Sequence, residues 1–274
     1  MPGLTGGIPG PAAVVPGPPE LAALHERAIP QKDGLCGPFW GALVLSAFGR
    51  PAEAEAVALS AGTVLAEGDP ERWLPPGAVP RTDYRVPLPT TRDGTLAGTS
   101  ATGLARAVEE LSGGEISVLP VAGPWSAEAV VGLIEVSSAT PGCVLVANCR
   151  TGRLWGSRAD PKLLLAHLLG GAGAVPAPDW DVGHFVQLVA AVRGPGGTLV
   201  AVRDTYPGLG WGGHHLQPAG AVAAALDRDD GAEGGVLCLC PPSEAGALRA
   251  RLEAAGRGLR HWDNGTPDGW RRGG

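Results

Sequence analysis

The pattern of apolar and polar positions is most informative between residues 31 and 48. A polar turn, Gln31-Lys32-Asp33-Gly34, leads to Cys36, and an apolar run follows. The apolar positions of this run have the spacing of a buried helical face: Phe39, Trp40, Leu43, Val44 and Ala47. Pro38 suits the first position of a helix, where its missing N–H is not needed. The pattern therefore predicts a helix over 38–48, with Cys36 just ahead of its first turn.

Periodicity and capping residues predict further helices and strands along the chain. The predicted helices cover residues 20–28, 51–66, 101–111, 126–136, 161–169, 219–226 and 244–255. The predicted strands cover residues 116–121, 142–148, 183–192, 198–204 and 235–240. Helices come mainly first and paired strands later, which favours an α+β fold with an antiparallel sheet.

Three changes in composition suggest how the chain is divided. Residues 1–19 are rich in Pro and Gly without periodicity and predict a disordered tail. Residues 20–256 carry the periodic segments and predict a single α+β domain, whereas residues 257–274 predict a poorly structured C-terminal tail. Inside the domain, residues 68–98 contain six Pro and predict a long irregular loop, a type of segment that is often functional.

Composition and charge narrow the classes of function. Apolar residues make up 44% of the chain and charged residues 18%, which is typical of a globular protein. The formal net charge of −6 argues against nucleic acid as a partner. No apolar run reaches the length of about 18 residues that a membrane span needs. The N-terminus has no basic segment before its weak apolar patch, so no signal peptide is expected.

The five cysteines predict a reduced, cytoplasmic protein. Cys143 and Cys149 bound one predicted strand, whose length of roughly 20 Å is too great for a disulfide. Cys238 and Cys240 are two positions apart on another strand, which is not a usual bridge. No two Cys or His pairs have zinc-finger spacing, so we expect no metal and no cofactor.

The position of Cys36 favours a reactive thiolate. A thiol at the start of a helix faces free N–H groups and the positive end of the helix dipole, and both favour the thiolate. The alternative is that Cys36 is a small core residue, since free cysteines are among the most buried residue types.

The predicted hairpin of residues 183–192 and 198–204 brings an imidazole and a carboxylate together. If Arg193 to Gly197 form the loop, His184 and Asp204 are diagonal neighbours, roughly 7–8 Å apart at the backbone. If the turn centres on Gly194, the two residues lie directly opposite. Either register keeps both side chains on one face of the hairpin.

These residues occur in motifs that resemble those of papain-like cysteine peptidases. The motifs are Gln31-x4-Cys36-Gly37-Pro38, then Gly183-His184-Phe185-Val186, then Val202-Arg203-Asp204-Thr205-Tyr206-Pro207. They are most similar to the C39-like bacterial branch, and the whole chain resembles an uncharacterised actinobacterial family. The resemblance implies a papain-like fold, in which a buried nucleophile helix packs on an antiparallel sheet. The separation of Gln31 and Cys36 is one residue shorter than is usual in the resembled family.

The roles that follow are those of a thiol hydrolase that acts on a peptide or amide bond. Cys36 is the expected nucleophile, His184 the general base and acid, and Asp204 the residue that orients His184. The amide of Gln31 is expected to assist the oxyanion. Two other functions share the motifs: transfer of the acyl group to an amine or thiol, and a binding module that retains the fold without catalysis.

Aromatic and histidine residues near these motifs leave two further alternatives. Trp180 and Trp211 flank the His184 and Asp204 segments and either line a substrate groove or pack in the core. His214 and His215 are adjacent, and adjacent residues of a strand point to opposite faces, so the pair is a poor metal-binding unit.

Overall fold

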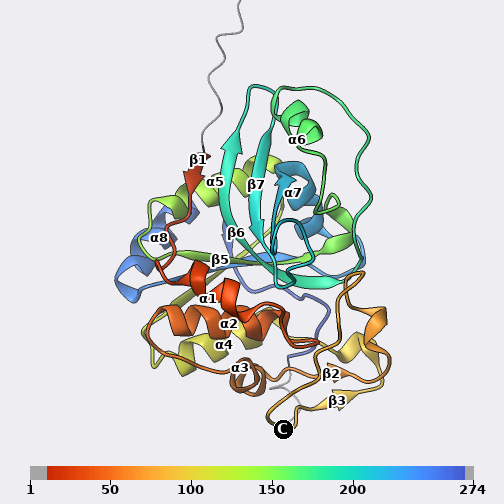
Figure 1. Cartoon of the computed structure of the whole chain (residues 1–274). Helices are drawn as coiled ribbons and strands as arrows, with labels where there is room; N and C mark the ends of the chain where they lie inside the picture. The colour runs from red at the N-terminus through yellow and green to blue at the C-terminus, as the bar shows by residue number, and fades with distance from the viewer. Residues whose placement is uncertain (1–10, 269–274) are drawn as a thin grey trace, which may run out of the picture.

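The structure is a computed structural model that describes residues 11–268, with helices on both faces of one large sheet (Figure 1). The helices are α1 (Leu21–Ala28), α2 (Cys36–Ala47), α3 (Ala54–Ala61), α4 (Ala101–Leu111), α5 (Ala127–Ser138), α6 (Pro161–Leu168), α7 (Ala219–Asp227) and α8 (Pro242–Ala254). The strands are β1 (Pro11–Val14), β2 (Leu65–Ala66), β3 (Thr90–Thr91), β4 (Ser117–Ala122), β5 (Val144–Arg150), β6 (Gly183–Arg193), β7 (Thr198–Arg203), β8 (His214–Pro218), β9 (Gly235–Cys240) and β10 (Gly258–Leu259). The fold is α+β, as the sequence predicts.

The large sheet has eight strands, and all its pairings are antiparallel. Its order is β10-β4-β9-β5-β6-β7-β8, with β1 paired to β6 beside this path, while β2 and β3 form a separate parallel pair. The central strands β5 and β9 are buried on both faces, because helices cover the sheet from both sides. This explains why their sequences are nearly continuous apolar runs rather than alternating ones.

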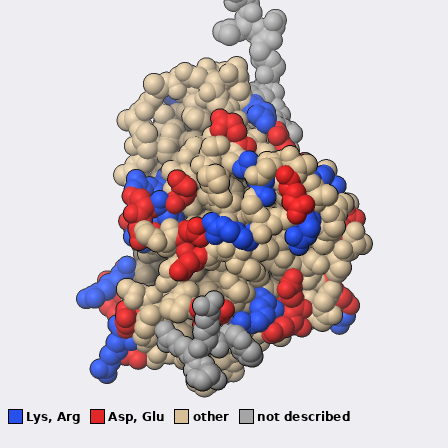
Figure 2. Space-filling model, turned by 180° about the vertical axis from the view of Figure 1, so that it is seen from behind, with Lys and Arg blue, Asp and Glu red and all other residues tan. Residues whose placement is uncertain are grey.

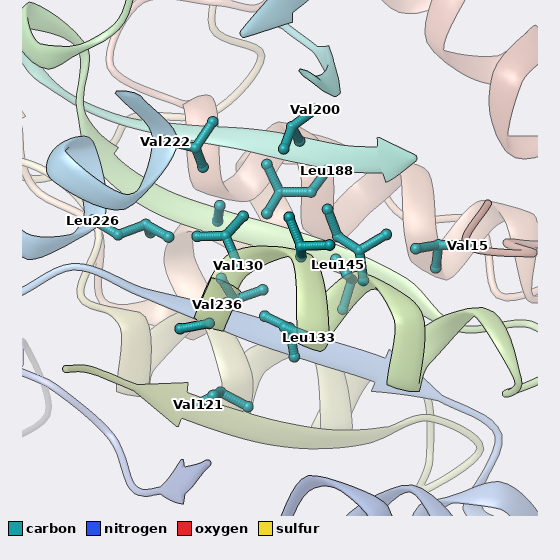
Figure 3. Close-up of a cluster of buried hydrophobic side chains, with 14 of the residues drawn as sticks. Val15, Val121, Val130, Leu133, Leu145, Leu188, Val200, Val222, Leu226 and Val236 are labelled. Carbon is teal, nitrogen blue, oxygen red and sulfur yellow. The ribbon is translucent and has the colours of Figure 1, made fainter. Parts of the chain in front are cut away.

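Two large clusters of apolar side chains fill the two sides of the sheet. One lies between the sheet and α5, α7 and α8, where Leu133, Leu226 and Leu145 meet (Figure 3). The other lies on the opposite face, under α1, α2, α3 and α4, and includes Trp40 and Leu104. Each fully buried side chain of this size contributes roughly 1.5–3 kcal/mol relative to an exposed one. Helix α2 is therefore fixed by its own burial.

A bulge in the β6–β7 hairpin decides which face His184 and Asp204 share. The register shifts by one residue at Val189. The flanking pairs are Ala190 with Ala201 on the turn side and Leu188 with Val202 on the far side. Because side chains alternate between faces, the unshifted register would place His184 and Asp204 on opposite faces. The bulge restores the diagonal relation that the sequence predicts.

The two predicted tails are partly ordered and need correction. Residues 11–14 of the predicted N-terminal tail form β1, which pairs with β6, and Ala13 within it is buried. A strand of four residues is too short to show periodicity. In the predicted C-terminal tail, β10 pairs with β4 and Trp262 is buried. The other tail residues, 1–10 and 269–274, lie outside the described residues.

The predicted helix 51–66 and the predicted loop 68–98 also differ from the structure. Helix α3 ends at Ala61 because Gly62 adopts a left-handed conformation with φ of 72°. The chain then forms β2, which pairs with β3 at Thr90–Thr91. Tyr84 and Leu88 pack beside buried Leu35, so the segment between the two strands is anchored next to Cys36.

The described surface mixes both signs of charge. Figure 2 shows acidic and basic side chains interspersed over the face seen from behind. Many of these charges pair, as in Arg150 with Asp181 and Arg260 with Glu233. Within residues 11–268, no helix is both long and apolar enough to cross a membrane.

Candidate active site

Cys36 is the first residue of α2, and the turn before it is built for this position. Gly34 has φ of 69°, and a Cβ there would lie 2.9 Å from a Leu65 side-chain carbon, so glycine suits the position in both conformation and space. The helix begins two residues earlier than predicted, so Pro38 is its third residue rather than its first, and residues 37–45 are all buried. Cys36 itself is partly exposed, whereas the other four cysteines are buried. The start of α2 therefore presents one accessible thiol.

Helix α2 holds both polar backbone groups of Phe185 in β6. The Trp40 indole N–H donates to the Phe185 carbonyl at 3.0 Å, and the Phe185 N–H donates to the Cys36 sulfur. These groups are free for α2 because the pairing of β6 with β7 extends only to Gln187. Residues 36 and 40 lie one turn apart on one helix face. Together they fix the thiol next to the residue that follows His184.

His184 and Asp204 form a buried pair beside the thiol. His184 Nε2 lies 3.0 Å from Asp204 Oδ1, and each side chain is only 2% exposed. The His184 ring also forms a hydrogen bond with Cys36. Because Nε2 is engaged by the carboxylate, Nδ1 is the ring nitrogen left for the sulfur. The structure thus joins the three predicted residues in the order Cys36, His184, Asp204.

The electrostatics of this chain favour charge separation. Burial opposes ionisation of Cys36, but the hydrogen bond and charge of His184, with the N–H groups of Phe185 and Gly37, lower its pKa. Burial likewise opposes the imidazolium of His184, yet the charge and hydrogen bond of Asp204 raise its pKa. The pKa of Asp204 is lowered despite its burial, because His184 and then His215 act on it. A thiolate and an imidazolium therefore coexist between the pKa values of Cys36 and His184.

Further contacts fix Asp204 from several sides. The Thr205 N–H donates to Asp204 Oδ1 at 2.6 Å. His25 of α1 donates from Nε2 to the Asp204 carbonyl at 2.6 Å. His215 of β8 places Nε2 3.6 Å from Asp204 Oδ2. The backbone carbonyl of Asp204 is thus held by α1, while its carboxylate is approached by β8 and by its own turn.

The amide of Gln31, the predicted oxyanion donor, already has a partner. Its side chain is buried and forms a hydrogen bond with the Tyr206 hydroxyl, while its Oε1 has no hydrogen-bond partner among residues 11–268. Its backbone N–H donates to the Thr205 carbonyl at 3.1 Å. Gln31 is therefore anchored to the residues that follow Asp204.

A cavity of about 270 Å³ opens beside Gln31. Phe39 and Leu43 of α2 line it, whereas Cys36 and His184 do not. Charged residues of both signs surround it, including Lys32 and Arg81. The segment 81–85 borders the cavity and is tied to the turn before Cys36, since the Arg81 guanidinium donates to the Pro30 carbonyl.

The two tryptophans predicted to line a groove have different surroundings. The Trp180 ring lies edge-on to the His184 ring, with centroids 5.0 Å apart, and contacts Tyr206 at 5.6 Å. Trp180 is partly buried and covers one side of the imidazole. Trp211 is 54% exposed, and the described residues show no ring contact between it and the site. Of the two tryptophans, the structure thus brings Trp180 into contact with the His184 ring and leaves Trp211 exposed.

His25 and His215 belong to the site but were not singled out by the sequence. His215 occurs in the pair that was weighed only as a metal site, and alternation along β8 does send its neighbour His214 toward His25 instead. His25 lies within a predicted helix, and nothing in that pattern indicates its contact with Asp204. The contacts of His25 and His215 with Asp204 join distant parts of the sequence, and no local pattern predicts such contacts.

Within the described part of the chain, no group of three or more Cys, His, Asp or Glu side chains has a geometry that could hold a metal ion. The three predicted residues that the structure brings into contact supply a thiol, an imidazole and a carboxylate.

Comparison with known proteins identifies a family whose function is unknown. No curated protein matches the sequence significantly. Residues 15–263, which include every residue of the site, match a family described as a family of unknown function (DUF6885). The chain belongs to this family.

Proposed function

We propose that the protein is a thiol hydrolase that cleaves a peptide or amide bond through an acyl-enzyme on Cys36. The observation that carries the proposal is the chain of contacts from a partly exposed thiol to a buried His184–Asp204 pair. A structural cysteine needs no such pair, whereas an activated nucleophile needs a base that a third group orients.

The geometry supports a two-step reaction. The Cys36 thiolate attacks the carbonyl carbon, and the C–N bond breaks as His184 gives its proton to the leaving amine. His184 then takes a proton from water, the hydroxide attacks the thioester, and the C–S bond breaks to release the acid and the thiolate. Asp204 keeps Nε2 of His184 engaged throughout, so that Nδ1 stays directed at the sulfur.

Stabilisation of the oxyanion falls to the start of α2 and to Gln31 in this proposal. Free N–H groups at a helix start favour developing negative charge. The Gln31 amide is close enough to the Asp204 turn to bond Tyr206, and a rotation of its side chain would present the amide N–H to the substrate. Of the four proposed residues, Cys36, His184, Asp204 and Gln31, only Gln31 must change its side-chain contacts to take its role.

The arrangement of elements supports a papain-like fold. In such a fold a buried nucleophile helix packs on an antiparallel sheet that carries the histidine. Helix α2 is buried from Gly37 to Leu45 and rests on β6, whose second residue is His184. The motifs at Cys36, His184 and Asp204 point to the same family of peptidases.

Labelling and turnover test the proposal together. We expect a peptidyl fluoromethyl ketone to modify Cys36 alone, as located by peptide mass mapping, and the protein to cleave members of a mixed peptide library. Cys36→Ser should abolish both, whereas Cys240→Ala, which removes a buried thiol outside the site, should retain both. Added amines would reveal acyl transfer as new amide products. Absence of both labelling and cleavage in the unmodified protein would overturn the proposal.

A further inference from the structure

His215 faces the one oxygen of Asp204 that His184 does not use. Asp204 Oδ1 receives His184 Nε2 at 3.0 Å and the Thr205 N–H at 2.6 Å. Oδ2 has His215 Nε2 at 3.6 Å, slightly beyond ordinary hydrogen-bond distance. His215 is 4% exposed. The carboxylate therefore lies between two imidazoles that approach its two oxygens.

The backbone of Trp155 determines which nitrogen of His215 carries the proton. The Trp155 N–H donates to Gln217 Oε1 at 2.8 Å, and Gln217 Nε2 donates to the Trp155 carbonyl at 2.8 Å. A backbone N–H can only donate and a carbonyl can only accept, so the orientation of the Gln217 amide is fixed. The same Nε2 lies 3.0 Å from His215 Nδ1 and must donate to it. His215 therefore carries its proton on Nε2, which faces Asp204.

Solvent has little room to replace this donor. The space beside Asp204 and His215 is a pocket of only about 10 Å³, about the size of one water, and the residues that line it include Trp155, Ser157 and Trp180. A buried carboxylate loses much of its stability when its oxygens lack donors. The orientation of Asp204 thus depends on the protein groups around it.

We infer that His215 is a positioning residue for the proposed reaction, which holds Asp204 in the rotamer that binds His184 by donating toward Oδ2. This inference rests on the proposed thiol hydrolase. It extends the chain of contacts to Cys36, His184, Asp204, His215 and Gln217, and ends it at the backbone of Trp155. His215 acts through Asp204 and touches neither the substrate nor the sulfur in this role.

The pH dependence of Cys36 alkylation reports the effect. The titratable groups around the sulfur are His184 from β6, Cys149 from β5, and Asp204 and Tyr206 after β7. Around His215 they are Asp204, His214 and Asp179, which lines the same small pocket. Burial raises the pKa of all four other cysteines, so iodoacetamide reacts at Cys36 well before it reacts elsewhere.

Two matched substitutions separate the donor from the packing. The amide N–H of His215→Gln can occupy the place of Nε2 and still donate toward Asp204. The shorter His215→Asn places its polar group near Nδ1, so it retains the contact with Gln217 and loses the donor. We expect His215→Asn to move the alkylation profile to higher pH by about one unit, which is about tenfold slower alkylation near pH 6. We expect His215→Gln to stay within about threefold of the unmodified protein at that pH.

The outcomes distinguish this inference from the proposed function. If His215→Asn and His215→Gln shift the profile equally, or if neither shifts it while His184→Ala does, His215 has no positioning role. If the unmodified protein already reacts as an ordinary thiol and His184→Ala changes nothing, the proposed function itself fails. Thermal unfolding of both variants, expected to be similar, shows that a difference in profile does not arise from a difference in folding.

Discussion

The substitution Trp40→Phe tests whether the contact between α2 and β6 positions the thiol. Trp40 is fully buried, and its indole N–H donates to the Phe185 carbonyl at 3.0 Å. Phenylalanine keeps an aromatic ring there but removes the donor and leaves the carbonyl without it. The variant should leave the fold intact and loosen the attachment of α2 next to His184.

The expected cost follows from two contributions. A buried carbonyl that loses its donor costs about 1–3 kcal/mol, and the smaller ring adds about 1 kcal/mol for incomplete packing. The sum of about 2–4 kcal/mol is below the total stability of a typical domain, about 5–15 kcal/mol. The variant should therefore fold with a lower denaturation midpoint.

Trp262→Phe is the matched control for this prediction. Trp262 is buried in the same cluster as Trp40, but its indole N–H has no hydrogen-bond partner among the described residues. Its replacement removes an unsatisfied donor, so the net change should lie within about 1 kcal/mol of zero. The two variants thus differ mainly in one hydrogen bond.

Urea denaturation and alkylation of Cys36 near neutral pH are the assays. Trp40→Phe should lower the free energy of unfolding more than Trp262→Phe does, and it alone should slow alkylation, because the hydrogen bonds to the sulfur weaken. Equal losses of stability in the two variants, together with unchanged alkylation, would refute the reasoning.

Three further predictions concern Asp204, His25 and two glycines. Asp204→Asn should slow Cys36 alkylation near pH 6 by about tenfold or more, since the imidazolium of His184 loses its charged partner. The control Asp179→Asn should leave the alkylation rate unchanged. Equal alkylation rates in the two variants would contradict the pairing of His184 with Asp204. Burial lowers the pKa of His25 to about 4, whereas His25 in the unfolded chain has the usual pKa of about 6.5. The unfolded chain therefore binds a proton that the folded protein does not bind, and the free energy of unfolding should fall by at most about 3 kcal/mol between pH 6.5 and 4, as measured by urea denaturation. His25→Gln keeps a donor for the Asp204 carbonyl and should remove most of this pH dependence. Gly103→Ala should destabilise the protein strongly, because a Cβ at this position would lie 2.2 Å from the Ala61 carbonyl oxygen. A Cβ at Gly132 would meet no atom within 4 Å, so Gly132→Ala should stabilise the protein by up to about 1 kcal/mol. Thermal unfolding measures both changes.

The hairpin shows how far local pattern predicts this site. Alternating apolar positions and the glycines at the turn predict β6 and β7 and place His184 and Asp204 on one face. The predicted register holds at Gln187 and Arg203 only because of the bulge at Val189. Nothing in the sequence around Val189 marks a bulge, since it depends on how β1 and β7 both pair with β6.

Other parts of the site depend on contacts that no periodicity encodes. Gly and Pro near Cys36 predict approximately where α2 begins. The hydrogen bond from Trp40 to the Phe185 carbonyl joins residues far apart in the sequence, so it could not be predicted before the sheet is assembled. The strand β8 follows a glycine-rich turn and is only five residues long, so its His215 could not be placed beside Asp204 in advance. Short strands paired to distant partners account for most of what the sequence did not predict.

The ion pair of Cys36 and His184 is the central claim, and titration of the thiolate tests it most directly. The ultraviolet absorbance of the thiolate, taken as the difference between the unmodified protein and Cys36→Ser, should appear well below the usual thiol pKa of about 8.5. It should persist as pH rises, and in His184→Ala its midpoint should move to the usual range or above. A midpoint at or above about 8.5 in the unmodified protein, unaffected by His184→Ala, would contradict the account.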